Sequence, residues 1–275
     1  MAKTEPFFSI VIPTLNEEKY LSGLLSDLAS QTYRDFEIII VDGKSTDKTT
    51  TIAKSFAKKV PKLSVLTSQK RHVCTQRNLG AFHARAPWII FVDADSRIAP
   101  YFLEGIKYRI ELTGAEIISP YFEPDVKSTQ NEAIAAVINL FLEIESTVKP
   151  TRLMESLVVV SRSAFHKIGG FDETVNYAEG KSFIRQAVKL GLSYKIIKDP
   201  TYTFSFRRLR KFGVMKIAGA IARTELSDLT GAKTNQQALS SLYPMLGGTL
   251  FTKTRTRRNK FTKNVRKILK LLEPS

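Results

Sequence analysis

Cysteine, histidine and long apolar runs are scarce in this sequence of 275 residues. The single cysteine, Cys74, excludes an internal disulfide, so we expect a protein of a reducing compartment, with the cytoplasm as the simplest location. The three histidines, His72, His83 and His166, lack the spacing of metal ligands. No apolar stretch is long enough to span a bilayer, and the N-terminus lacks the apolar region of a signal peptide. We therefore expect neither a membrane-spanning nor a secretory segment.

Acidic residues are also few, and the resulting charge is unevenly placed. The chain carries 42 Lys and Arg against 26 Asp and Glu, a formal net charge of +16. Residues 207–275 contain 16 of the basic residues but only 3 acidic ones, a surplus of 13, which leaves +3 for all the residues before them. The basicity therefore belongs to the C-terminal segment. This difference in charge between the two regions predicts two parts, a main domain at 1–205 and a basic helical segment at 206–275.

The basic segment has a pattern of its own. Residues 253–260 are rich in Lys and Arg, and apolar residues then recur at helical spacing up to Leu272. A basic amphipathic helix at 253–272 indicates docking on an anionic membrane surface, which would make the protein peripheral to the membrane. The competing interpretation is a solvated helix whose apolar stripe packs on the main domain. Nucleic-acid binding is disfavoured, because the sequence has no recognition helix, zinc motif or stacking aromatic pattern.

Residues 7–205 alternate between short apolar runs and helical patterns. The runs at 7–13, 36–41, 63–66, 88–93, 116–119, 157–160 and 194–197 are rich in β-branched residues and predict strands, the last ended by Pro200. Helices are expected at 17–31, 45–56, around 78–81, and at 100–112, 133–144 and 180–190, with Gly191 as the last C-cap. Such alternation is typical of an α/β fold with a mostly parallel, Rossmann-like central sheet and flanking helices.

Two carboxylates follow the most apolar of these strands. The run from Trp88 to Val92 ends abruptly at Asp93, Ala94 and Asp95. Ligands of open α/β sheets bind beyond the carboxyl ends of the strands, and paired carboxylates there can hold a divalent cation that in turn holds a diphosphate. A lone Asp-x-Asp is a weak signal, since a solvated turn has the same pattern. The strand before it and the motifs around it strengthen the prediction of a Mg²⁺ or Mn²⁺ site.

Five motifs follow one another along the chain. They are Ser9-Ile-Val-Ile-Pro-Thr-Leu-Asn-Glu-Glu18, Ile39-Ile-Val-Asp-Gly-Lys-Ser-Thr-Asp47, Arg77-Asn78-x-Gly80-Ala81, Phe91-Val-Asp-Ala-Asp95 and Gly169-Gly-Phe-Asp-Glu173. In this order they resemble the motifs of family 2 glycosyltransferases. The resemblance covers about residues 7–205. It implies a GT-A fold, a nucleotide-diphospho-sugar donor and inversion at the anomeric carbon.

The resemblance also implies roles for residues in the donor site. The first loop, with Pro13, Thr14, Asn16 and Glu17, would line the nucleotide, and Asp42 would accept an N–H from its base. Asp93 and Asp95 would bind the metal, with Ala94 between them at the donor.

Several of these residues have a second interpretation. Glu17 also completes a capping box with Thr14, which is a purely structural role. Arg77 is either a contact to the diphosphate or ribose, or a surface arginine. Arg207 and Arg208 could neutralise the leaving diphosphate, or simply begin the basic helix.

An inverting transfer needs a base for the acceptor hydroxyl. The resemblance places this base in a Glu-Asp pair that starts a helix after the Gly-Gly turn. Here Glu179 matches the glutamate, but Gly180 stands where the aspartate is expected. Glu179 is therefore the predicted base, with Asp172, Glu173 and loss of ordinary activity as the alternatives.

The sequence thus predicts an inverting hexosyltransferase-like enzyme. It would move a sugar from a nucleotide-diphospho-sugar to an acceptor hydroxyl or a lipid phosphate, so a lipid-linked acceptor is one option. A catalytically impaired GT-A-like protein that only binds nucleotide sugars is the alternative. Nucleotidyl transfer is disfavoured, because the expected Gly-rich entry loop with Arg and Lys is missing after the first strand.

Overall fold

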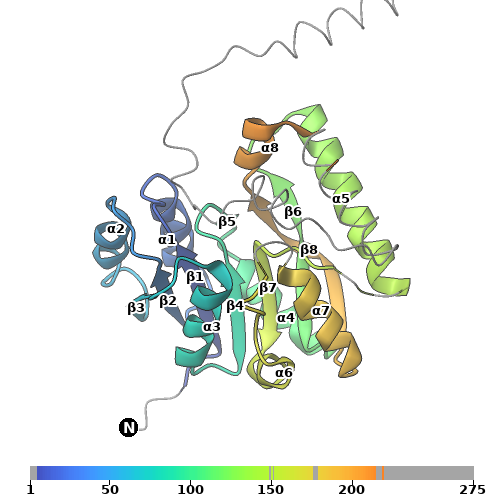
Figure 1. The fold of residues 1–275 in the computed structure, drawn as a ribbon, viewed down its shortest axis with the longest axis horizontal. Helices are drawn as coiled ribbons and strands as arrows, with labels where there is room; N and C mark the ends of the chain where they lie inside the picture. The colour runs from blue at the N-terminus through green and yellow to red at the C-terminus, as the bar shows by residue number, and fades with distance from the viewer. Residues whose placement is uncertain (1–4, 149, 151, 176–178, 215–218, 220–275) are drawn as a thin grey trace, which may run out of the picture.

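A computed structural model of the chain describes residues 5–148, 150, 152–175, 179–214 and 219. It is a layered α/β structure in which helices flank one curled sheet (Figure 1). The strands are β1 (Phe8–Thr14), β2 (Phe36–Asp42), β3 (Leu63–Thr67), β4 (Trp88–Val92), β5 (Arg97–Ile98), β6 (Ile117–Pro124), β7 (Leu157–Ser161) and β8 (Tyr194–Phe204). The helices are α1 (Leu21–Ala29), α2 (Thr49–Ser55), α3 (Val73–His83), α4 (Phe102–Thr113), α5 (Thr129–Val148), α6 (Arg162–Ile168), α7 (Glu179–Lys189) and α8 (Arg207–Phe212).

The sheet has the strand order β3-β2-β1-β4-β7-β6-β8-β5. Strands β1 to β4 run parallel to one another, so their carboxyl ends meet at one edge of the sheet. Strand β7 is inserted antiparallel between β4 and β6, while β6 and β8 run parallel. The expected α/β fold is confirmed, and its first half is parallel as predicted. The antiparallel β7 starts beside the end of β4, which brings the residues before β7 to the edge where β4 ends.

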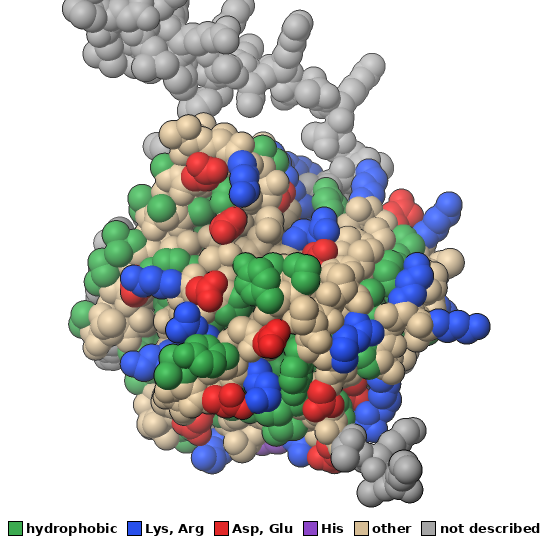
Figure 2. All heavy atoms as spheres, turned by 180° about the vertical axis from the view of Figure 1, so that it is seen from behind, with side chains coloured by type: hydrophobic (Ala, Val, Ile, Leu, Met, Phe, Trp, Pro, Cys, Tyr) green, Lys and Arg blue, Asp and Glu red, His purple; other side chains and the backbone are tan. Residues whose placement is uncertain are grey.

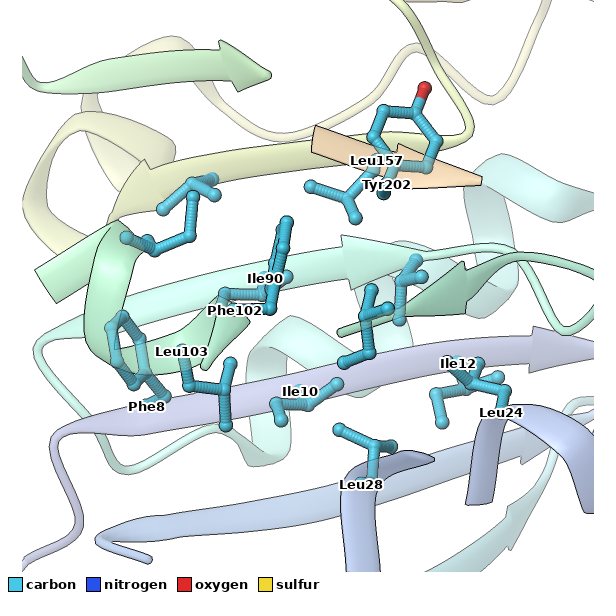
Figure 3. Close-up of a cluster of buried hydrophobic side chains, with 14 of the residues drawn as sticks. Phe8, Ile10, Ile12, Leu24, Leu28, Ile90, Phe102, Leu103, Leu157 and Tyr202 are labelled. Carbon is cyan, nitrogen blue, oxygen red and sulfur yellow. The ribbon is translucent and has the colours of Figure 1, made fainter. Parts of the chain in front are cut away.

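The central strands are buried on both faces, and alternate side chains pack against different helices. Phe8, Ile10 and Ile12 of β1 pack with Leu24 and Leu28 of α1 and with Phe102 and Leu103 of α4 (Figure 3). The intervening residues, represented by Val11, Ile39 and Phe91, pack on the other face against α3, α6 and α7. This explains the near-continuous apolar runs, since a strand covered by helices on both faces has no solvent side. Two cores therefore hold the strand ends in place.

The structure corrects several predicted boundaries. Strand β8 continues through Pro200 to Phe204, because residues 198–201 lie in an irregular stretch of its pairing with β6 that needs no regular ladder bond from the proline. Helix α1 begins at Leu21, four residues later than expected, since residues 15–20 form a turn. The short helix α6, which the sequence analysis missed, is capped by Ser161, whose Oγ accepts the Ala164 N–H at 3.2 Å.

Charged side chains of both signs are interspersed over the face seen in Figure 2. This agrees with the small net charge expected before residue 207. The predicted amphipathic helix at 253–272 lies outside the described residues, and so does most of the predicted segment 206–275, so both remain predictions. Of the helices in the described ranges, none combines the length and apolarity needed to cross a membrane.

Candidate active site

The first, second and fourth motifs meet at the carboxyl edge of the parallel strands. Thr14 at the end of β1 is in register with Asp42 at the end of β2, and β4 on the other side of β1 leads directly into Asp93. Both Thr14 and Asp42 are only 2% exposed. The structure thus brings together the loops that the sequence analysis assigned to the nucleotide and to the metal.

Hydrogen bonds fix the two loops against each other. The Asp42 carboxylate accepts from Thr14 Oγ1 at 3.2 Å, from Ser45 N at 2.8 Å and from Ser45 Oγ at 2.5 Å. Asn16 has a left-handed backbone with φ 56°, and its Oδ1 accepts the Thr46 N–H at 2.7 Å. Asparagine tolerates this backbone region better than most residues. Asp42 is therefore held in one orientation, with acceptor capacity in its two oxygens beyond these three bonds.

The paired aspartates lie beyond β4, each against a different arginine. Arg77 Nη2 is 3.0 Å from Asp93 Oδ1, and Arg207 Nε is 2.7 Å from Asp95 Oδ2. The Asp93 side chain is 36% exposed and that of Asp95 is 11% exposed. Burial, together with the charges of Asp95 and Glu179, raises the pKa of Asp93 to about 6 although Arg77 acts in the opposite direction. The pair therefore lies in a region of excess negative charge.

Arg77 is a buried residue that contacts several parts of the site. It is 2% exposed, and besides Asp93 it contacts Glu179 Oε1 at 2.9 Å and the backbone carbonyl of Glu155 at 2.8 Å. Burial lowers the pKa of Arg77, but the surrounding carboxylates outweigh this and raise it, so the guanidinium stays charged. The alternative that Arg77 is a surface arginine is therefore wrong. Its planar guanidinium donates to Asp93 after β4 and to Glu179 of α7, and so joins two elements.

Helix α3 can carry Arg77 to this point because it lies directly on the sheet. A Cβ built on Gly80 would be 2.3 Å from Val11 Cγ1 and 3.1 Å from Val41 Cγ2, which only glycine avoids. Glycine at position 80 therefore allows α3 to pack closely on β1 and β2.

Arg207 closes the other side of the site. It forms two bonds to Glu17, of 2.8 and 2.9 Å, in addition to its contact with Asp95, and its guanidinium lies 4.7 Å from the centre of the Tyr20 ring. Burial raises the pKa of Glu17, with Asp95 and Asp93 adding to the shift and Arg207 opposing it. The Thr14 hydroxyl donates to Asp42, so Thr14 and Glu17 do not form the capping box. Glu17 instead pairs with Arg207, which lies 190 positions away in the sequence.

Helix α8, which carries Arg207, is anchored by Asp125 after β6. The Asp125 carboxylate accepts the Phe206 N–H at 3.0 Å and pairs with both terminal nitrogens of Arg210 at 2.7 Å. This carboxylate at the start of the helix also suits the helix dipole. Arg208 follows on the same helix and is half-buried.

Glu179 begins α7 and is 6% exposed. A second carboxyl, that of Glu155, lies beside Glu179, and its Oε1 accepts the Gly180 N–H at 2.7 Å. Burial and the charge of Glu179 raise the pKa of Glu155 well above its usual value. Sequence reasoning missed Glu155, whose only signal was an acidic residue just before a strand.

The remaining predicted residues fall into two groups. Pro13 and Ala94 are buried in the same strand-end region as Thr14 and Asp93. Asp172 is exposed in a turn, where its carboxylate accepts the Thr174 N–H at 2.9 Å, and Glu173 is exposed and bonded to Thr75 at 2.7 Å. Asp172 and Glu173 thus lie in exposed contacts with Thr174 and Thr75, whereas Glu179 is buried and pairs with Arg77.

The aspartates fit a metal that is shared with a ligand. Within the described part of the chain, no group of three or more His, Cys, Asp or Glu side chains could hold a metal ion. Mg²⁺ is commonly bound by one or two carboxylates together with substrate phosphates rather than by a complete protein cage. The ion pairs described above use one oxygen of each aspartate, Oδ1 of Asp93 and Oδ2 of Asp95. Two neighbouring carboxylates are therefore a suitable partial ligand set.

Solved structures share this fold. A fragment of TarS from Staphylococcus aureus in complex with UDP-GlcNAc aligns with a TM-score of 0.57 at 20% identity, over 94% of this chain and 77% of that one. A mannosyltransferase from Pyrobaculum calidifontis in complex with GDP-Man and Mn²⁺ aligns with a TM-score of 0.61 at 18% identity, over 98% and 81%. At such low identity these likenesses establish the fold alone, which is that of the GT-A glycosyltransferases.

The sequence comparisons identify the family. The profile of "Glycosyl transferase family 2" matches residues 9–169, more than half of the chain. The chain therefore belongs to family 2 of the glycosyltransferases.

Two curated relatives illustrate the range of the family. The poly(ribitol-phosphate) beta-N-acetylglucosaminyltransferase TarS of Staphylococcus aureus (strain Mu50) is 26% identical over 211 residues, which is 73% of this chain and 36% of the relative. A dolichyl N-acetyl-alpha-D-glucosaminyl phosphate glucuronosyltransferase of Methanococcus voltae is 37% identical over 103 residues, 36% of this chain and 32% of the relative. The matches thus span about a third of the length of these relatives.

Proposed function

We propose that this protein transfers a sugar, with inversion, from a nucleotide-diphospho-sugar to an acceptor hydroxyl, with Mg²⁺ or Mn²⁺ on the diphosphate. The observation that carries the proposal is the meeting of Asp42, Asp93 and Asp95 at the carboxyl edge of β1, β2 and β4, between Arg77 and Arg207. Crevices at this edge are where open α/β sheets bind nucleotides.

The charge balance of the site supports a metal. Among the described residues, the contacts of the site join six carboxyls and two guanidiniums, namely Glu17, Asp42, Asp93, Asp95, Glu155, Glu179, Arg77 and Arg207. An anionic diphosphate would meet net repulsion there unless a cation came with it. Asp93 and Asp95 would hold that ion, and when bound it would neutralise charge on the diphosphate leaving group.

Asp42 and the first loop would bind the nucleotide. A buried, oriented carboxylate is a suitable acceptor for the N–H of a uracil or guanine ring. The relatives solved with UDP-GlcNAc and GDP-Man support donors of this class. The particular base and sugar are the first quantities to measure.

Arg207 would act on the diphosphate at Asp95, whereas Arg77 lies at Asp93. It lies on Asp95 and Glu17, so an incoming diphosphate on the metal would come within reach of its guanidinium. The role of Arg77 would be different, because it is buried and holds Asp93 and Glu179 in place. We therefore propose Arg207 as a substrate-binding residue and Arg77 as a positioning residue.

The acceptor class is supported by the relatives. Their names include a poly(ribitol-phosphate) acceptor and a dolichyl-linked sugar phosphate. We propose an acceptor of this kind, a hydroxyl on a lipid-linked or polymeric phosphate.

Calorimetry with intact protein tests the donor site. UDP-N-acetylglucosamine, GDP-mannose and dTDP-glucose are titrated with MnCl₂, and again with EDTA. We expect one donor to bind with the metal and to bind at least about tenfold more weakly without it. Asp95→Asn should reproduce the loss, while Asp35→Asn, an exposed aspartate before β2, should not. Equal affinity with EDTA, or no binding of any donor, would contradict the proposal.

The competing function is nucleotide-sugar binding without transfer, which the glycine at position 180 favours. Under that alternative the parent protein would bind a donor but release no nucleoside diphosphate from it. Glu179→Gln would then leave the release of nucleoside diphosphate at the same background level as in the parent.

A further inference from the structure

The space beside Gly180 is filled by a carboxylate from another element. A Cβ built on Gly180 would lie 2.7 Å from Glu155 Cγ, 2.8 Å from Leu153 Cδ1 and 3.0 Å from Glu155 Oε1. Any side chain at position 180 would therefore compete with Glu155 for the same volume. Glycine at 180 and glutamate at 155 are complementary in space.

Backbone contacts hold Glu155 at the edge of the site. Gly180 N donates to its Oε1 at 2.7 Å, from the first turn of α7, where the helix dipole favours a negative group. The carbonyl of Glu155 accepts from Arg77, and the carbonyl of the next residue, Ser156, accepts the Asp93 N–H at 2.9 Å. The segment that leads into β7 is thus tied directly to the aspartate pair, and Glu155 itself is only half-buried.

Two neighbouring carboxyls here differ in their electrostatic surroundings. Arg77 Nη1 lies 2.9 Å from Glu179 Oε1, so the Glu179 side chain is already held by a guanidinium. The same guanidinium reaches Glu155 only through its backbone carbonyl in the contacts described above. Burial and the charge of Glu179 raise the pKa of Glu155, with Arg77 and the Gly180 N–H opposing them. Of the two side chains, that of Glu155 is half-buried and lies outside the Arg77 contacts described above, whereas that of Glu179 is 6% exposed and held by Arg77.

We propose that Glu155 is the catalytic base of this site, acting from the segment before β7 in the space that Gly180 leaves open, with Glu179 as its positioning partner. The inference rests on the proposed function. The acceptor hydroxyl gives its proton to the Glu155 carboxylate while its oxygen forms a bond to the anomeric carbon. The bond from that carbon to the diphosphate oxygen breaks, and its electron pair leaves with the nucleoside diphosphate.

The test measures chemistry and donor binding separately in the full chain. The probe is whichever of UDP-N-acetylglucosamine, GDP-mannose and dTDP-glucose the parent protein binds with MnCl₂. The rate is the release of nucleoside diphosphate, with water or a membrane extract as acceptor, followed from pH 5 to 9. The variants are Glu155→Gln, Glu155→Asp and Glu179→Gln, and the matched control is Glu132→Gln, an exposed glutamate in the first turn of α5.

Glu155→Gln should release nucleoside diphosphate at least about 100-fold more slowly than the parent, while the donor Kd changes less than about threefold. The parent rate should rise with pH as Glu155 ionises, and this rise should be lost in Glu155→Gln. Glu155→Asp keeps a carboxylate and should retain both part of the rate and the rise. Glu179→Gln should shift the position of the rise, because it removes the neighbouring charge, and Glu132→Gln should match the parent.

Three other results would overturn the inference in distinguishable ways. If the parent binds and cleaves a donor but Glu155→Gln stays within tenfold of its rate with the same pH dependence, the base lies elsewhere and the proposed function survives. If Glu155→Gln loses donor binding and rate together, its role is structural. If the parent neither binds nor cleaves any donor, the proposed function fails and the assignment of a base fails with it.

Discussion

At the scale of the residue, several buried carboxylates in the described part of the chain are paired with guanidinium groups. Arg77, Arg85 and Arg207 each contact a carboxylate that is almost or fully withdrawn from water. Ionised groups in such places are stable only when charge and hydrogen bonds are both satisfied, so removal of one partner is costly. Glu37 lies near the start of β2, whereas the site residue Asp42 ends that strand. The cost of removing one partner of a buried ion pair can therefore be measured at Glu37 without interference from ligands.

Glu37→Gln should lower the free energy of unfolding by about 1–3 kcal/mol at pH 7. Burial alone would raise the pKa of Glu37, but hydrogen bonds from Arg85 and Ser9 outweigh it and lower the pKa. The ionised group therefore stabilises the fold above its unfolded-state pKa, and this contribution is lost as the pH falls through the lowered folded-state pKa.

Urea unfolding of parent and Glu37→Gln between pH 7 and pH 3 provides the measurement, with the exposed Glu132→Gln as control. The difference in free energy of unfolding between Glu37→Gln and the parent should become smaller toward pH 3. A difference that stays constant over this range would show that ionisation of Glu37 does not stabilise the fold.

At the scale of the element, the site depends on how closely α3 lies on β1 and on how α8 is held. Gly80 allows α3 to approach β1, because its missing side chain permits contact with Val11 and Val41. Asp125 holds α8, because its carboxylate accepts the Phe206 N–H and pairs with Arg210. Neither residue contacts the aspartate pair in the bonds described, yet each positions an element that carries a site arginine.

Gly80→Ala should destabilise the protein by about 1–3 kcal/mol, because its Cβ would lie 2.3 Å from Val11 Cγ1 and the packed sheet cannot give way freely. Gly23→Ala in α1 is the matched control. Its Cβ would meet only the side chain of Arg97 at 3.3 Å, and alanine favours the helix by up to about 1 kcal/mol. Denaturant midpoints compare the two variants. Equal midpoints would mean that α3 does not depend on a glycine for its approach.

Asp125→Asn should weaken donor binding about tenfold with little change in the melting temperature. The substitution removes the charge that holds Arg210, so α8 and with it Arg207 would be less well positioned. Glu123→Gln, an exposed glutamate two residues earlier, is the control. Calorimetry with the donor and MnCl₂ gives both affinities. If Asp125→Asn binds as tightly as the parent, Arg207 does not need the Asp125 anchor.

At the scale of the whole molecule, charge is divided between two regions. The residues before 207 carry a formal surplus of only 3 positive charges, whereas residues 207–275 carry 13. The main part shows interspersed charges on the face in Figure 2 and would not by itself be drawn to an anionic surface. Any attraction to a membrane would therefore have to come from the C-terminal segment.

Replacement of Arg255, Arg257 and Arg258 by Gln should weaken binding to vesicles of anionic phospholipid on the order of 100-fold. Each basic residue near such a surface contributes about 1 kcal/mol. Lys54→Gln, Lys58→Gln and Lys59→Gln together, at exposed positions in and after α2, remove the same charge and should have little effect. Vesicle co-sedimentation at low and physiological salt compares the two triple variants. Equal partitioning would favour packing of the segment on the main domain.

The sequence by itself determined which residues stand at strand ends. A fully buried strand reads as a continuous apolar run, and Asp42 and Asp93 directly follow such runs. Parallel strands bring these ends to one edge, so the nucleotide loop and the aspartate pair could be placed together in advance. The order of five motifs, rather than any one of them, indicated the family.

Only the tertiary structure decided which charges meet. Arg77 and Glu179 are 102 positions apart, and Arg207 and Glu17 are 190 apart. Glu155 has no motif, and it reaches Gly180 because the antiparallel strand β7 returns beside β4. Local patterns report the period and the ends of each element, because those depend on near neighbours. Ion pairs between distant elements depend on how the layers pack and on the desolvation that packing imposes, and neither is encoded in any short stretch of sequence.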